Sequence, residues 1–263
     1  MASLTSRRGI FSRGAFCITI LFFYLPLSVL TLFSFNASKT MSWSGFSLRW
    51  YQDLFFNSPP LWSAFAKSIG IALASSVAST VIGTLGAIGL YWYSVKYKKA
   101  LRLITFLPLL LPEIILGVAL LIFFAGVHIE LGLMTIFIAH TSFNIPYVFL
   151  ILLARLEEFD YSIIEAAYDL GARERDVLLR VTLPMCFPAI MAGFLISLTL
   201  SLEDFVITFF VAGPGSTTLP LYIYSMIRFG VSPVINALSV VLIAGTILFA
   251  LSTVRFYKYF LRK

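Results

Sequence analysis

The chain alternates long apolar stretches with short polar connections. A bilayer core about 30 Å thick requires roughly 20 apolar residues per helix, and six stretches meet this requirement. The ten-residue segments of alternating hydrophobicity that are typical of a membrane β-barrel do not stand out. The pattern predicts an all-α integral membrane protein, one domain over 1–263. We expect its six transmembrane helices at 14–35, 66–92, 103–125, 131–153, 185–211 and 235–256.

The composition excludes an ordinary water-soluble fold. Sixty per cent of the residues are apolar, 12% are charged, and the mean hydropathy is +0.96. A soluble domain of this size carries about 25% charged residues, so this chain has too little polar surface to cover itself in water. Its two cysteines, Cys17 and Cys186, provide neither a disulfide framework nor a zinc cluster.

The basic residues indicate the orientation. The net charge is +7, and Lys and Arg accumulate in cytoplasmic loops of membrane proteins. Assigning the N-terminal tail to the cytoplasm puts all but four of the nineteen basic residues on that side. We therefore expect both termini in the cytoplasm, and we attribute the charge to topology and not to a nucleic-acid partner. The four exceptions are Lys39, Arg49, Lys67 and Arg228.

The largest cytoplasmic loop is predicted at 156–183. It holds more than half of the twelve acidic residues, so it must lie in water. Ser162 and Glu165 have the spacing of a capping box, which marks a helix start, and Gly171 is the type of residue that ends one. We expect a second short helix over 173–181, before Pro184 restarts the chain into the fifth span.

Three carboxylates fall inside predicted spans: Glu113, Glu203 and Asp204. A charge at the centre of a membrane helix costs about 2.5–3.5 kcal/mol on insertion scales, so such groups usually face a polar cavity. Because no basic residue accompanies them, the cavity would be negative and would suit a cationic cargo. The alternative is helix capping or an interfacial position, and Glu113 could cap a helix that restarts after Pro112.

Aromatic and polar side chains accompany these acids. Tyr147, Phe205 and Tyr222 could contact ammonium groups through cation–π attraction, although packing and lipid contact are ordinary alternatives. His140 is expected to form hydrogen bonds between helices. It has no metal partner in sequence, because the other histidine, His128, is twelve residues away.

The cytoplasmic loop carries a family resemblance. Glu165-Ala166-Ala167, followed by Gly171 and then by Leu183-Pro184, is similar to the EAA motif of ABC importer permeases. Over most of the chain, and especially over 201–239, the sequence resembles the second permease subunit of the spermidine/putrescine importers. The resemblance implies the type I importer permease fold and a bacterial inner-membrane location.

The resemblance also implies partners. They are a second permease subunit, two copies of a cytoplasmic ATPase that binds ATP and magnesium, and an external substrate-binding protein that delivers a polyamine. The residues expected to couple the chain to the ATPase are Glu165, Ala166, Ala167, Asp169, Gly171, Leu183 and Pro184. Those expected along the substrate pathway are Glu203, Asp204, Glu113, Tyr147, Phe205 and Tyr222.

The chain shows no motif for its own energy supply. It lacks the phosphate-binding sequence G-x-x-x-x-G-K-[ST] and the common hydrolase motifs. We therefore expect a permease and not an enzyme, with no cofactor of its own. Two alternatives stay open: the same architecture serving ferric iron, thiamine or another organic cation, and an ATP-independent channel or secondary transporter.

Overall fold

The computed structural model describes residues 2–39, 42–93, 96–160, 162–229 and 233–260, and almost all of its regular structure is helical. The helices are α1 Ala2–Ser34, α2 Arg49–Phe56, α3 Pro59–Trp92, α4 Lys98–Leu110, α5 Glu113–Gly126, α6 Leu133–Glu157, α7 Ser162–Asp169, α8 Glu174–Val177, the π-helix η1 Leu178–Thr182, α9 Leu183–Glu203, α10 Val206–Val211, α11 Leu219–Phe229 and α12 Val234–Phe260.

Four helical segments among the described residues are long and apolar enough to cross a membrane, or five if the bent pair α4–α5 is one span. The predicted spans 14–35, 66–92 and 131–153 each coincide with one of these segments to within a few residues. The predicted sixth span falls within α12, where Val234–Leu248 is an apolar helix of shorter length. An all-α membrane fold is therefore confirmed, while the six crossings stay a prediction.

Two predicted spans are wrong in their continuity. The third, 103–125, is bent by 107° between α4 and α5, because the residue before Pro112 is restricted to an extended conformation. The fifth, 185–211, does not run to its predicted end, since the helix stops at Glu203 and a separate short helix follows.

The chain forms two compact units. The first comprises residues 1–59 and 225–263 and contains α1, α2 and α12; α12 contacts both other helices. Between α1 and α2 the turn is closed by Asn36, whose side chain donates to the Ser42 carbonyl and accepts from the Ser44 N–H, both at 2.9 Å. Trp50, buried in the same turn, donates from its indole to the Asn36 carbonyl at 2.6 Å.

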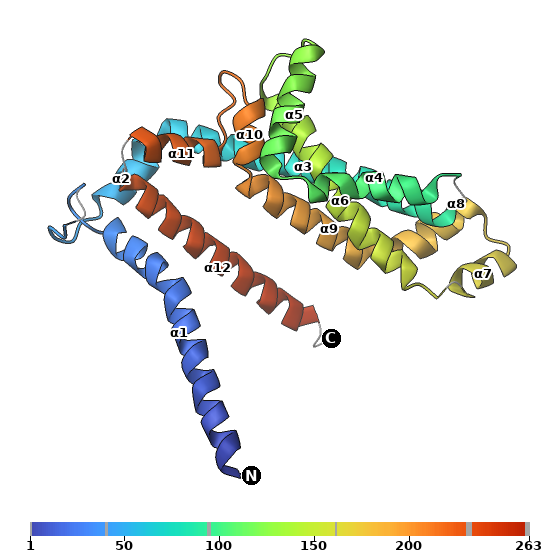
Figure 1. Cartoon of the computed structure of the whole chain (residues 1–263), viewed down its shortest axis with the longest axis horizontal. Helices are drawn as coiled ribbons and strands as arrows, with labels where there is room; N and C mark the ends of the chain where they lie inside the picture. Colours follow the sequence, from blue (N-terminus) through green and yellow to red (C-terminus); the bar gives the residue numbers. More distant parts are fainter. Residues whose placement is uncertain (1, 40–41, 94–95, 161, 230–232, 261–263) are drawn as a thin grey trace. The chain divides into compact units, whose positions relative to one another are not determined.

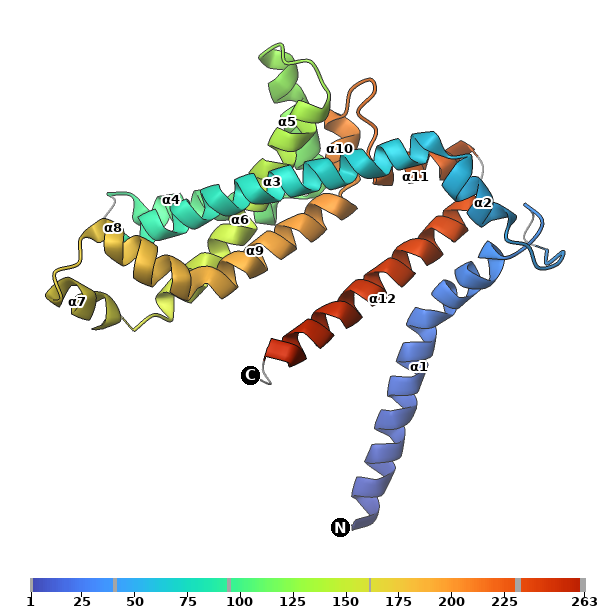
Figure 2. The same ribbon diagram turned by 180° about the vertical axis from the view of Figure 1, so that it is seen from behind.

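The second unit, residues 60–224, contains α3 to α10 and most of α11. In it α6 packs along α9, while α5 packs against α10 (Figure 1). Seen from behind, α7 and α8 lie at the end of this unit away from α5 and α10 (Figure 2). Both candidate sites described below belong to this unit.

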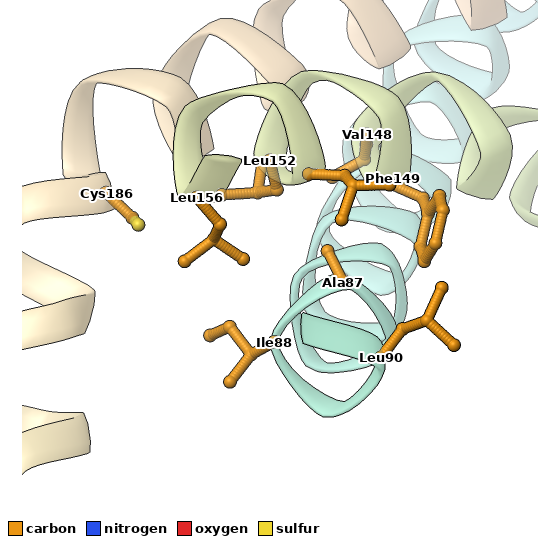
Figure 3. Close-up of a cluster of buried hydrophobic side chains, with 9 residues drawn as sticks. Ala87, Ile88, Leu90, Val148, Phe149, Leu152, Leu156 and Cys186 are labelled. Carbon is orange, nitrogen blue, oxygen red and sulfur yellow. The ribbon is translucent and has the colours of Figure 1, made fainter. Parts of the chain in front are cut away.

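One apolar cluster of the second unit joins three helices (Figure 3). Ala87, Ile88 and Leu90 come from α3, Cys186 comes from α9, and the remainder comes from α6. The side chains from α6 are Val148, Phe149, Leu152, Leu153 and Leu156. Small residues let membrane helices approach closely; α3 and α9 supply Gly83 and Gly193, and both lie against Val148.

Gly83→Val is expected to destabilise this core. A Cβ at Gly83 would lie 2.8 Å from the Cβ of Val148, which is fixed on its own helix. Overpacking of this kind costs about 1–3 kcal/mol, so the purified protein should unfold at a lower temperature. Gly89→Val is the matched control in the same helix, because nothing lies within 4 Å of a Cβ there. Equal melting temperatures for the two variants would contradict the packing described here.

Candidate functional site

A pocket of about 530 Å³ is lined by residues at two helix breaks and by Phe143 and Tyr147 of α6. One break is the bend between α4 and α5, and the other separates α9 from α10. Five of the six residues predicted along the substrate pathway line this pocket, whereas Tyr222, on α11, is not among them. The five are Glu113, Tyr147, Glu203, Asp204 and Phe205.

The three acids differ in exposure. Glu113 and Glu203 are exposed, while only 5% of the Asp204 side chain is exposed. Glu113 is the first residue of α5, one position after the N-cap Pro112, so the helix restarts after Pro112, as the alternative from the sequence supposed. A carboxylate is favourable at a helix N-terminus, and the same side chain lines the pocket. The two roles are therefore compatible.

Aromatic rings stand beside the carboxylates. Tyr147 and Phe205 are half-buried and contribute to the pocket wall, together with Phe143. The Phe205 ring also contacts Tyr224, with ring centroids 4.6 Å apart. Exposed carboxylates next to aromatic faces form a site that attracts organic cations through charge and through cation–π contact.

The break between α9 and α10 is formed by Asp204. Its backbone is extended, with φ −62° and ψ 120°, and its carboxylate accepts hydrogen bonds from the N–H groups of Ile207 and Thr208 at 3.2 and 2.8 Å. Asp204 thus acts as a capping residue for α10. The sequence anticipated hydrogen bonding by His140, and the structure confirms it: the ring contacts Ser201, Asp204 and Thr208.

A second candidate site is the turn after α7. The Gly171 N–H donates to the Tyr168 carbonyl at 2.8 Å, and the Ala172 N–H donates to the Ala167 carbonyl at 3.1 Å. These two bonds define a Schellman motif, in which the residue after the helix takes a left-handed conformation. Gly171 has φ +82°, so its predicted role as the end of this helix is confirmed.

Helix α7 presents small and apolar side chains outward. Glu165 and Ala166 are exposed, Ala167 is half-buried, and the Leu170 side chain is 89% exposed. Only Ile164 of this helix is buried. Asp169, the last residue of α7, is exposed as well. Apolar surface facing outward in a polar loop is a feature of interaction sites.

Polar contacts tie the flanks of this segment to the helix bundle. Glu157 pairs with Arg102 of α4, and Glu174 of α8 accepts a hydrogen bond from Tyr93. The neighbouring Glu174 carboxylate raises the pKa of the Tyr93 hydroxyl above its usual value. The contacts join both flanks of the segment to the helix bundle, while the outer face of α7 stays exposed.

The helix start differs from the prediction. The Ser162 N–H donates to Asp160 Oδ1 at 3.0 Å, so the Asp160 carboxylate accepts from the first N–H group of α7, and Ser162 is the first residue of the helix.

The predicted restart of the helix at Pro184 is wrong too. The helix runs from Glu174 to Glu203 through the π-helix, and Pro184 is the second residue of α9, directly after that irregular turn. Leu183 is half-buried there, and Pro184 is exposed.

Asp160→Ala is expected to fray the first turn of α7. Hydrogen bonds from Ser162 lower the pKa of the Asp160 carboxyl, so the bonded carboxylate stabilises the folded turn at neutral pH. This stabilisation is complete above the pKa of the unfolded carboxyl group, about 4. It is lost as the pH falls from there through the lower pKa of the folded state. Hydrogen exchange corrected for intrinsic rates should show lower protection of residues 162–165 in the variant at pH 7. Asp160→Asn, which can still cap, is the control; equal protection in all three proteins would contradict the assignment.

Comparison with known proteins places this geometry in a family. Residues 79–263 match the family model of the binding-protein-dependent transport system inner membrane component. The chain is 39% identical over 235 residues to the spermidine/putrescine transport system permease protein PotC of Haemophilus influenzae, covering 89% of this chain and 91% of that protein. It is 39% identical over 232 residues to the putrescine transport system permease protein PotI of Escherichia coli, covering 85% and 82%.

A solved structure shows the same fold. A bacterial ABC transporter involved in the import of the acidic polysaccharide alginate aligns with a TM-score of 0.75 at 15% identity, covering 94% of this chain and 96% of that one. At this identity the likeness concerns the fold alone. Together with the family match over 79–263 and relatives at 39% identity, it leads to one conclusion: the chain belongs to the family of inner-membrane permease components of binding-protein-dependent transport systems.

Proposed function

We propose that this protein is a permease subunit of an ATP-driven importer for polyamines such as spermidine and putrescine. The observation that carries the proposal is the pocket in which exposed Glu113 and Glu203 stand beside Tyr147 and Phe205. A polyamine offers ammonium groups separated by apolar methylene chains, which matches carboxylates interleaved with aromatic rings. The names of relatives at 39% identity point to the same cargo.

The energy for transport comes from a partner in this proposal. A separate ATPase binds ATP and magnesium and contacts the outer face of α7, where Glu165 supplies a charge and Ala166 allows close approach. Leu183 and Pro184 support the segment from the first turn of α9. ATP-driven closure of two ATPase copies moves α7 and thereby alters the pocket between the two helix breaks.

The remaining partners are proposed from the family to which the chain belongs. One chain provides half of a translocation pathway, so a second permease subunit faces the pocket, and an external binding protein delivers the cargo. The termini and α7 lie on the cytoplasmic side, in agreement with the distribution of basic residues. Tyr222 is proposed to contact cargo on its way to the pocket.

The experiment is uptake by the complete transporter in proteoliposomes. The chain is purified with the subunits encoded beside it, and uptake is measured for spermidine, putrescine, thiamine and ferric iron, with ATP and with a non-hydrolysable analogue. We expect polyamine uptake that requires hydrolysis and saturates, while the other solutes do not compete. Uptake of thiamine or iron, without uptake of polyamine, would contradict the proposed cargo and would identify that solute as the cargo instead. Polyamine uptake without ATP would contradict an ATP-driven importer.

A further inference from the structure

A buried polar network connects four helices of the second unit. His140 of α6 contacts the Ser201 hydroxyl of α9 through Nδ1 at 2.6 Å, and Nε2 lies 2.9 Å from the Thr208 hydroxyl of α10. The same Nε2 lies 3.2 Å from Asp204 Oδ2. Ser201 extends the network to Ser75 of α3 at 3.1 Å. All five side chains are buried.

The Asp204 carboxylate accepts several hydrogen bonds within this network. Oδ1 accepts from the Ile207 N–H, and Oδ2 accepts from the N–H and the hydroxyl of Thr208 at 2.8 and 2.7 Å. A proton on Nε2 of His140 provides the fourth donor, and Nδ1 then accepts from Ser201. Oδ2 thus lies within hydrogen-bonding distance of three donors, and because only 5% of the side chain is exposed, the carboxylate offers little surface to an ammonium group of the cargo.

The neighbouring residue has the opposite surroundings. Glu203 is exposed toward the pocket, whereas Asp204 is almost completely buried. The difference depends on the helix break, since Asp204 turns inward to cap α10 while Glu203 ends α9. Phe205, the next residue, returns to the pocket wall. The break therefore determines how Glu203 and Phe205 are presented.

We infer that His140 and Asp204 are positioning residues that hold the α9–α10 break, and that Glu203 and Glu113 are the carboxylates that contact the cationic cargo. The inference rests on the proposed function, because it assigns separate tasks to residues of the same pocket. Consecutive acids in the sequence thus serve different purposes: one contacts cargo and the other maintains the backbone.

The test compares two substitutions that remove one charge each. Uptake of putrescine, with two ammonium groups, and spermidine, with three, is measured in proteoliposomes that contain the complete transporter. Glu203→Gln should raise KM by roughly tenfold, the worth of one charge-assisted contact, and the increase should be larger for spermidine. Asp204→Asn keeps a capping side chain, so it should lower the maximum rate while the ratio of the two KM values stays unchanged.

Variants of His140 test the positioning role separately. His140→Leu removes the ring's contacts with Ser201, Asp204 and Thr208, so it should lower the maximum rate and raise KM for both amines by the same factor. His140→Gln retains an N–H donor in place of Nε2 and should restore part of the rate. Assembly of each complex is checked by size-exclusion chromatography, and the measurements with His140→Gln decide the matter if His140→Leu fails to assemble.

The outcomes separate the inference from the proposed function. If Asp204→Asn raises KM with the same preference for spermidine as Glu203→Gln, Asp204 contacts cargo and the inference is overturned. If His140→Leu and His140→Gln both transport at the normal rate, the positioning role is overturned. If wild-type protein shows no polyamine uptake, the proposed function fails instead.

Discussion

A transporter that carries Gly171→Pro is expected to hydrolyse ATP with little import of cargo. Gly171 has φ +82° and donates its N–H to Tyr168, whereas proline fixes φ near about −65° and has no N–H. The strained backbone costs about 1–3 kcal/mol, and the lost hydrogen bond adds about 1 kcal/mol. The end of α7 would therefore be disrupted where we propose that the ATPase docks, and uptake should fall by roughly tenfold or more.

The measurement is the ratio of cargo imported to ATP hydrolysed, in proteoliposomes that contain the complete transporter. Gly171→Asn is the matched control, because asparagine tolerates the left-handed conformation that ends a helix. It should retain most of the uptake. A normal ratio in Gly171→Pro would show that this turn has no part in coupling.

Neutralising both exposed carboxylates of the pocket should have the second large effect. In the double variant Glu113→Gln and Glu203→Gln, the pocket keeps its shape but loses its two exposed charges. Each charge-assisted contact is worth about 1.5–3 kcal/mol, so polyamine uptake at low cargo concentration should fall by roughly a hundredfold or more. The basal ATPase activity should change little, because neither residue belongs to the coupling segment.

Glu130→Gln provides the control for this experiment. Glu130 is an exposed glutamate that is not among the residues lining the pocket, so its neutralisation removes one negative charge, as each of the two pocket substitutions does, without altering the site. Uptake by Glu130→Gln should match the unmodified protein. If uptake by the double variant also matched that of the unmodified protein, the two exposed carboxylates would have no part in cargo uptake.

The features predicted correctly from the sequence depend on local chemistry. Gly171 could be recognised as a helix end because the left-handed conformation favours glycine whatever surrounds it. The helix start at Glu113 was among the alternatives, since Pro112 restricts the backbone before it. Long apolar helices were predictable for a different reason, because the thickness of the bilayer sets their length.

The break between α9 and α10 could not be predicted in this way. No proline or glycine marks it. Asp204 accepts from two N–H groups at the start of α10, and His140, 64 positions earlier in the chain, contacts the same carboxylate from another helix. The same dependence explains why two consecutive acids, alike in sequence, differ in exposure.

Pro184 shows the opposite error. A proline after a polar loop suggested a restart of the helix, yet the helix is continuous from Glu174. The π-helix Leu178–Thr182 widens the turn before it, so the regular hydrogen-bond pattern is already interrupted where proline, which has no N–H, enters α9. A local irregularity of this kind has no sequence signal.

The most direct measurement tests whether α7 touches an ATPase. A photo-reactive amino acid is placed at Ala166, on the exposed face of α7, in the complete transporter in its membrane. The account predicts a cross-link to the ATPase subunit, with a yield that changes on ATP binding, and none when the same group is placed at the exposed Leu103 of α4. Cross-links from position 166 to lipid or water alone, with the ATPase present, would contradict the central claim.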